Sequence, residues 1–168
     1  PYQTACGVVD ILMHTMERYM CTNPDNELID RMSEGLMTAV IDSGRTAMSA
    51  PEDYEARATL MFAGSLSPNG LTGAGRSCGL WAHKLQHEMS ALDDRIAHGA
   101  GLAVVTPAWM KYVSPKHQGM IAQFAVKVMG VEGSFREPDA LIREGISRLE
   151  RFYRELGLPT TMEELNIK

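Results

Sequence analysis

The sequence predicts an all-α protein built as a bundle of several helices. Apolar side chains recur at spacings of three and four through most of the chain, which is typical of helices that bury one face. No segment alternates apolar and polar residues with β-branched enrichment, and no two-residue hairpin turn separates two apolar runs. The 168 residues, without internal repeats, are enough for one domain with a substantial core.

The first helix should cover residues 4–21, and Asn23-Pro24-Asp25 should end it. Its buried stripe would consist of Val8, Val9, Leu12, Met13, Met16 and Met20. A second helix should follow over residues 26–48. Its buried side would consist of Leu28, Ile29, Met32, Leu36, Met37, Val40 and Ile41.

Pro51 should open the third helix, because proline is favoured at the first helical position. Glu52 and Asp53 would then lie in its first turn, where negative charge complements the helix dipole, and the helix would run to about Leu66. Residues 67–79 are dense in turn formers and predict a loop.

Residues 81–92 should form the next helix. The run His98-Gly99-Ala100-Gly101 then leads into an apolar helix that continues through residues 105–113, and Pro107 should kink or delay it. The glycines beside His98 would permit a close approach of the backbone to a neighbouring element.

Ser114 as N-cap and Pro115 at the first helical position should start another helix, which ends at Gly130. Residues 138–156 predict a further helix that is closed by Gly157. Thr160 and Glu163 have the spacing of a capping box for a helix that the chain barely begins.

The composition excludes several functional classes. The net charge is -5, and no run of lysine or arginine could follow a phosphate backbone, so nucleic acid is not an expected partner. No apolar stretch approaches the roughly 20 residues that span a bilayer, and no signal-peptide pattern is present, so no membrane partner and a cytoplasmic location are expected.

Three cysteines, Cys6, Cys21 and Cys78, show no C-x-x-C spacing. An odd number of widely separated cysteines favours reduced, buried thiols over a disulfide framework or a cysteine-based zinc site.

A carboxylate and several histidines form the most unusual pattern in the chain. Asp10 and His14 are four residues apart, as are His83 and His87, so each pair shares one face of a helix. With His98 nearby, these side chains could converge on a divalent transition metal. Asp10 also interrupts an apolar run, and a buried carboxylate needs a partner. A histidine pair alone more often serves as satisfied core residues or exposed caps than as metal ligands, and His87 could replace His83 as a ligand on chemistry alone.

Several runs resemble the iron-containing (group III) alcohol dehydrogenases, and most closely their butanol dehydrogenase branch. These runs are YQTACGVVD at residues 2–10, DYEARA at 53–58, WAHKLQHEMSAL at 81–92, HGAGLA at 98–103 and PAWMKY at 107–112. The resemblance covers essentially the whole chain. Glycerol dehydrogenase and dehydroquinate synthase, which share the broad fold, match residues 81–98 less well.

The resemblance implies a site and a fold. The fold would be the helical C-terminal domain of the dehydroquinate synthase-like type. Fe²⁺ or Zn²⁺ would be held by Asp10, His14, His83 and His98, and His87 would be a catalytic residue that also faces the substrate and the nicotinamide. This sequence is one residue longer than the family pattern between His87 and His98, which puts the last histidine ligand in question.

The resemblance also implies an activity and partners. The substrate would be a small primary alcohol or aldehyde, and the protein would form a homo-oligomer. NAD(P) would be held mainly by an N-terminal α/β domain for which residues 1–168 have no counterpart, and the usual C-terminal end after Leu165 is also expected to be missing. The isolated piece should then be inactive. The alternative is a non-catalytic metal-binding or structural helical domain.

Overall fold

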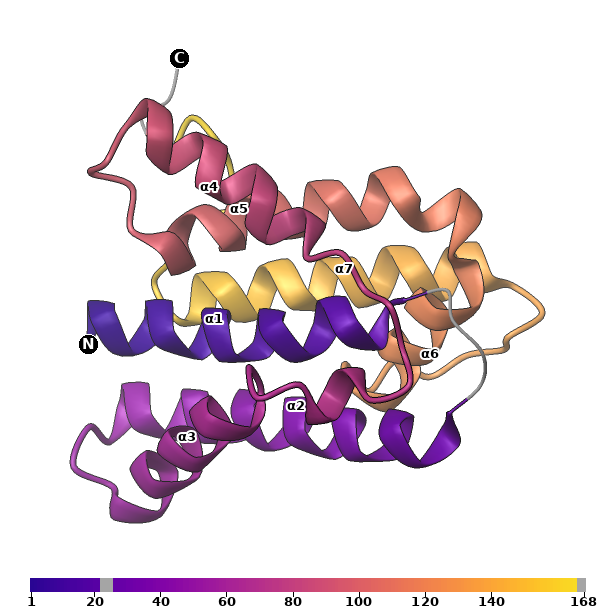
Figure 1. Ribbon diagram of the computed structural model, residues 1–168, viewed down its shortest axis with the longest axis horizontal. Coiled ribbons are helices and arrows are strands. Elements are labelled where there is room, and N and C mark those ends of the chain that lie inside the picture. Colours follow the sequence, from indigo (N-terminus) through magenta and orange to yellow (C-terminus); the bar gives the residue numbers. More distant parts are fainter. Residues whose placement is uncertain (22–25, 166–168) are drawn as a thin grey trace.

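The computed structural model describes residues 1–21 and 26–165, and over these residues it contains seven α-helices and no strand. The predicted all-α fold is therefore confirmed. Figure 1 shows α1 (Tyr2–Tyr19) crossing the middle of the molecule. On one side of α1 lie α2 (Glu27–Ser49) and α3 (Tyr54–Leu66), and on the other lie α4 (Trp81–Leu92) and α5 (His98–Val113).

Two further helices and two 3₁₀ turns complete the bundle. The turns are Leu71–Gly73 and Ser114–Lys116. The last helices, α6 (Gln118–Lys127) and α7 (Pro138–Glu155), pack closely against each other, because a Cβ atom added to Gly145 of α7 would lie only 2.4 Å from Cβ of Ala125. No helix in the described part of the chain is both long and apolar enough to cross a membrane.

The core surrounds α1. Every residue of its predicted apolar stripe is buried, and Leu12, Met13, Met16 and Tyr19 are wholly inaccessible to solvent. The prediction for α2 is partly wrong, because Leu28 and Met32 are exposed. These two residues form their own i, i+4 line, which is rotated away from the line that includes the buried Ile29.

Helix starts differ from prediction where a side chain other than the expected one satisfies the first free backbone N–H groups. Asp53 is the N-cap of α3 and accepts a hydrogen bond from Ala56 N at 2.8 Å, so Pro51 and Glu52 precede the helix. Ser114 does not cap a long helix. Its hydroxyl donates to the Lys111 carbonyl, and only a 3₁₀ turn follows before α6.

At the C-terminal end of the described chain, the capping box is shifted by one residue, because Thr161 and Glu164 make the reciprocal bonds. Pro107 lies inside α5, which begins at His98, so the proline does not delay this apolar helix. The predicted break at Asn23-Pro24-Asp25 lies outside the described residues.

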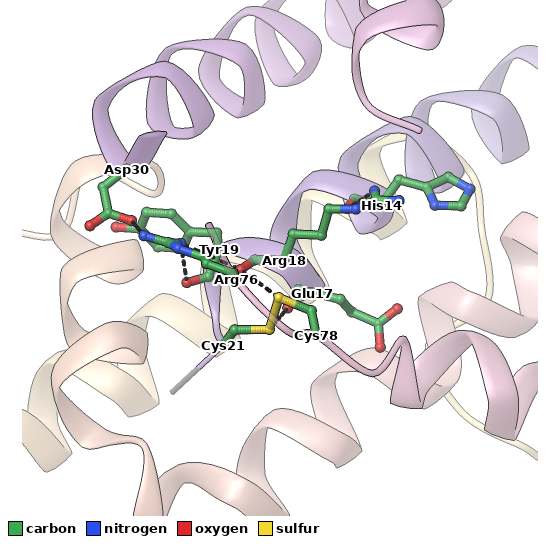
Figure 2. Close-up of a disulfide and its surroundings, with 8 residues drawn as sticks. All are labelled: His14, Glu17, Arg18, Tyr19, Cys21, Asp30, Arg76 and Cys78. Atoms are coloured by element: carbon green, nitrogen blue, oxygen red, sulfur yellow. Dashed lines mark hydrogen bonds and ion pairs between the residues drawn. A yellow bond between two sulfur atoms is a disulfide. The ribbon is translucent and has the colours of Figure 1, made fainter. Parts of the chain in front are cut away.

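Cys21 and Cys78 form a disulfide, whereas the sequence favoured reduced thiols. Figure 2 shows that the bond joins the segment after α1 to the segment that leads into α4. The Arg76 side chain lies in the same place. It pairs with Asp30 of α2 and donates to the Arg18 and Tyr19 carbonyls at the end of α1. Sequence spacing did not reveal the pair, because contact between residues 57 apart depends on the tertiary fold. Cys6 is free and buried, as expected.

Candidate metal centre

Three helices bring a carboxylate and three imidazoles together. Asp10 and His14 lie on α1, His83 lies on α4, and His98 is the first residue of α5. The Asp10 Oδ1 atom is 3.5 Å from His14 Nε2, 3.3 Å from His83 Nε2 and 3.4 Å from His98 Nε2. The same nitrogen of each ring therefore faces one oxygen.

These spacings suit a small divalent ion. With metal–ligand bonds of roughly 2.1 Å, neighbouring ligand atoms of a tetrahedral site lie about 3.4 Å apart. Ligand atoms of Asp10, His14 and His83 all lie within 4.8 Å of one another. His98 joins this group through Asp10, because its Nε2 atom lies 3.4 Å from Asp10 Oδ1. It follows the turn between α4 and α5, in which Ile96 N donates to the Asp93 carbonyl.

The centre combines buried and accessible groups. The His83 side chain is 5% exposed, whereas those of Asp10 and His98 are 38% and 36% exposed. An ion or a small molecule could thus reach the centre from the side of Asp10 and His98.

The two histidines from α4 and α5 are each held by a second side chain. His83 Nδ1 bonds to the Glu17 carboxylate, and His98 Nδ1 bonds to the Gln86 side-chain oxygen. Gln86 is fixed in turn, because its Nε2 donates to Ser90 Oγ at 2.7 Å. Such partners orient a ligating histidine and select its tautomer. Among the described residues, His14 Nδ1 is buried without a hydrogen-bond partner.

The electrostatics favour the ligand forms of three of these groups. Burial raises the pKa of Asp10, but its hydrogen bond to His83 and the nearby histidines outweigh that effect, so the net pKa is lowered. Burial, with further effects from neighbouring charges, lowers the pKa of both His14 and His98. Asp10 is therefore an anion and these two imidazoles are neutral near pH 7, as metal coordination requires.

His83 differs from the other two histidines. Burial disfavours its charged form, but hydrogen bonds to Asp10 and Glu17 outweigh burial and raise its pKa to about 9. The proton on His83 thus supplies positive charge to the cluster, and a metal ion would have to displace it.

His87 lies beside this cluster. It is exposed on α4, and its ring centroid is 5.4 Å from that of His98 and 6.4 Å from that of His83. Among the described side chains, it is His83 and not His87 that bonds to Asp10. The fifth histidine, His117, lies between the second 3₁₀ turn and α6.

The sequence pattern did not single out Glu17 and Gln86. Glu17 is three residues after His14 and seven after Asp10, so it shares their face of α1, and Gln86 is three residues after His83. That spacing was a usable signal. However, which of the many carboxylates and amides would reach a histidine depends on how α1, α4 and α5 pack.

Comparison with known proteins identifies the family of the chain. Residues 4–168 match the model of the Fe-containing alcohol dehydrogenase family, C-terminal. NADH-dependent butanol dehydrogenase A of Clostridium acetobutylicum is 35% identical over 166 residues, covering 98% of this chain and 42% of that protein. NADPH-dependent aldehyde reductase YqhD of Escherichia coli is 34% identical over 168 residues, covering 99% of this chain and 42% of that protein.

Solved structures agree with this match. The substrate- and cofactor-free form of aldehyde reductase YqhD from E. coli has a TM-score of 0.93 at 34% identity, covering all of this chain and 44% of that one. NADH-dependent butanol dehydrogenase A from Thermotoga maritima has a TM-score of 0.92 at 37% identity, covering all of this chain and 42% of that one. The chain thus spans about two fifths of the length of these relatives. It belongs to the iron-containing alcohol dehydrogenase family, and it corresponds to the C-terminal part of that family's proteins.

Proposed function

We propose that this chain is the metal-binding part of an NAD(P)-dependent alcohol dehydrogenase that interconverts small primary alcohols and aldehydes. Asp10, His14, His83 and His98 would hold one divalent ion, Fe²⁺ or Zn²⁺. The observation that carries the proposal is the convergence of three Nε2 atoms on one oxygen of Asp10. Three imidazoles and a carboxylate suit both ions, and intrinsic affinity favours zinc.

When bound, the ion would act as a Lewis acid that polarises the oxygen of the alcohol or aldehyde during hydride transfer to or from the nicotinamide. The protein residues orient and balance this centre. Asp10 supplies the negative charge, while Glu17 and Gln86 hold the rings of His83 and His98 in place.

His87 is proposed to face the substrate and the nicotinamide and to relay the proton. Its ring is exposed and close to that of His98, so it can exchange protons with solvent while remaining next to the centre.

The nicotinamide dinucleotide would be held mainly by an N-terminal α/β domain and not by residues 1–168. Support comes from the relatives, which are more than twice as long as this chain. Two of them are named as NADH-dependent and NADPH-dependent respectively, so the proposal covers both nucleotides. Assembly into homo-oligomers is part of the same proposal and can be measured by light scattering.

Metal binding is the first test. The chain is stripped with a chelator and titrated with Zn²⁺ or Fe²⁺, and the bound metal is measured by elemental analysis. One equivalent should bind. His98→Ala should abolish stoichiometric binding, while His117→Ala, the control, should bind like the parent. Retention of one equivalent by His98→Ala would remove that residue from the site.

A second assay separates catalysis from metal binding alone. Residues 1–168 and a longer protein that includes the proposed nucleotide-binding domain are assayed with butyraldehyde and NADH or NADPH. The longer protein should turn over, and the isolated chain should bind metal without turnover. A longer protein that binds metal but neither binds nucleotide nor turns over would favour a non-catalytic domain.

A further inference from the structure

Glu17 is an unusual residue for the central helix of the core. It lies on α1 three residues after His14, and its side chain has no exposed surface. Figure 2 shows Glu17 and His14 leaving the same helix. A carboxylate removed from water is costly unless hydrogen bonds or charges compensate for its lost hydration. The position therefore requires an explanation.

Both carboxylate oxygens of Glu17 bond to residues of α4. Oε1 accepts a hydrogen bond from the backbone N–H of Ala82 at 2.6 Å, and Oε2 bonds to His83 Nδ1. Ala82 is the second residue of α4, so its N–H has no carbonyl partner within the helix. Leu80, the N-cap, provides no side-chain bond. Glu17 thus caps α4 from another helix.

This contact also fixes the orientation of the His83 ring. With Nδ1 turned toward Glu17, Nε2 faces Asp10 at 3.3 Å. The adjacent residues Ala82 and His83 are bound by the two oxygens of one carboxylate, so the start of α4 and the direction of its histidine are set together.

We propose that Glu17 is the positioning residue of the metal centre, whose carboxylate holds His83 with Nδ1 protonated so that Nε2 is free to bind the ion. The inference rests on the proposed function and extends it beyond the four ligands. Hydrogen bonding to a carboxylate also makes an imidazole a stronger donor to a metal. The Nδ1 atom of His98 bonds to the neutral side chain of Gln86 and not to a carboxylate, so His83 is the more strongly donating of the two.

The variant Glu17→Gln tests this role. A glutamine has a single side-chain oxygen, so its NH₂ group would face either Ala82 N–H or His83 Nδ1–H as donor against donor. Glu88→Gln is the matched control, because it removes the same charge from an exposed position of α4. Both variants and the parent are titrated with Zn²⁺ against a competing chelator, and folding is followed by circular dichroism. Glu17→Gln should bind Zn²⁺ about 10- to 100-fold more weakly than the parent, and Glu88→Gln should stay within about twofold.

Nitrogen NMR of the ¹⁵N-histidine-labelled, Zn²⁺-loaded parent gives a second readout, which is the ring nitrogen of His83 that carries the proton. A purely structural role of Glu17 would not determine this position. His83 should carry its proton on Nδ1, and this measurement does not depend on whether Glu17→Gln folds. A His83 proton on Nε2, or Zn²⁺ binding by folded Glu17→Gln within twofold of the parent, would overturn the inference. Failure of the parent itself to bind Zn²⁺ would instead refute the proposed function.

Discussion

Gly99→Ala should weaken both the fold and the metal centre, because the backbone of α5 lies against the backbone of α1 at Gly99. A Cβ atom added to Gly99 would lie 2.2 Å from the Cys6 carbonyl oxygen and 2.5 Å from Cys6 Cα. Non-bonded carbon atoms normally stay about 3.5 Å apart, so the two helices would have to separate by roughly 1 Å.

The displaced residue is the neighbour of His98, whose Nε2 lies 3.4 Å from Asp10 Oδ1 on α1. Ligand distances in metal sites are held within about 0.2 Å, so a shift of this size should reduce Zn²⁺ affinity at least tenfold. The overpacking should lower the unfolding free energy by about 1–3 kcal/mol. The higher helix propensity of alanine should offset up to about 1 kcal/mol of this loss.

Urea unfolding and Zn²⁺ titration measure the two effects. Gly7→Ala is the matched control on α1, because nothing lies within 4 Å of its added Cβ. The control should be as stable as the parent or more stable by up to about 1 kcal/mol, with unchanged Zn²⁺ affinity. If Gly99→Ala matched the control in both measurements, the close approach of α5 to α1 would not be what positions His98.

Three further predictions concern stability. First, Asp53→Ala should lower the unfolding free energy by about 1 kcal/mol in urea titrations, since it removes the bond to Ala56 N, whereas Asp53→Asn should recover most of the loss. Second, because the pKa of His83 is raised, its contribution to the stability of the chelator-treated chain should be complete below about pH 6.5, the ordinary histidine pKa, and should be lost as the pH rises through the folded pKa of His83, about 9. Urea midpoints that do not change over that range, or a decline of equal size in His83→Gln, would contradict this. Third, reduction of the Cys21–Cys78 bond, which spans a sequence separation of 57, should cost about 4 kcal/mol in the chain-entropy model. Thiol titration before and after unfolding should find one free thiol per chain without reductant, and three would mean that the bond does not form.

Local rules predicted most of the helices, because a bundle of this kind buries stripes that are already visible in the sequence. The bounds of α4 are as predicted, and the α1 stripe is buried throughout. The errors in the helix starts lie where neighbouring residues could begin the same helix. The N-cap of α3 is Asp53, two residues after Pro51. Near the C-terminus, Thr161 and not Thr160 accepts the capping hydrogen bond.

Contacts between distant segments could not be read from spacing. The i, i+4 pairs placed Asp10 with His14 and His83 with His87, but they did not say which histidine of α4 would turn toward Asp10. The approach of α1 to α4 decides this, and it also brings Glu17 to His83 and Cys21 to Cys78. Each of these contacts joins residues more than fifty positions apart, beyond the reach of helical periodicity.

The sulfur link between Cys21 and Cys78 also determines how the molecule would respond to a protease. Residues 22–77, with α2 and α3 among them, form a covalently closed ring. A single cut in the exposed turn around Pro51 would open this ring without releasing a fragment, so the nicked protein would migrate as one species on a non-reducing gel and as two after reduction. The four side chains of the centre all lie outside the ring, Asp10 and His14 before it and His83 and His98 after it. After a cut within the ring, the Cys21–Cys78 bond would be the covalent connection that keeps the two pairs in one molecule.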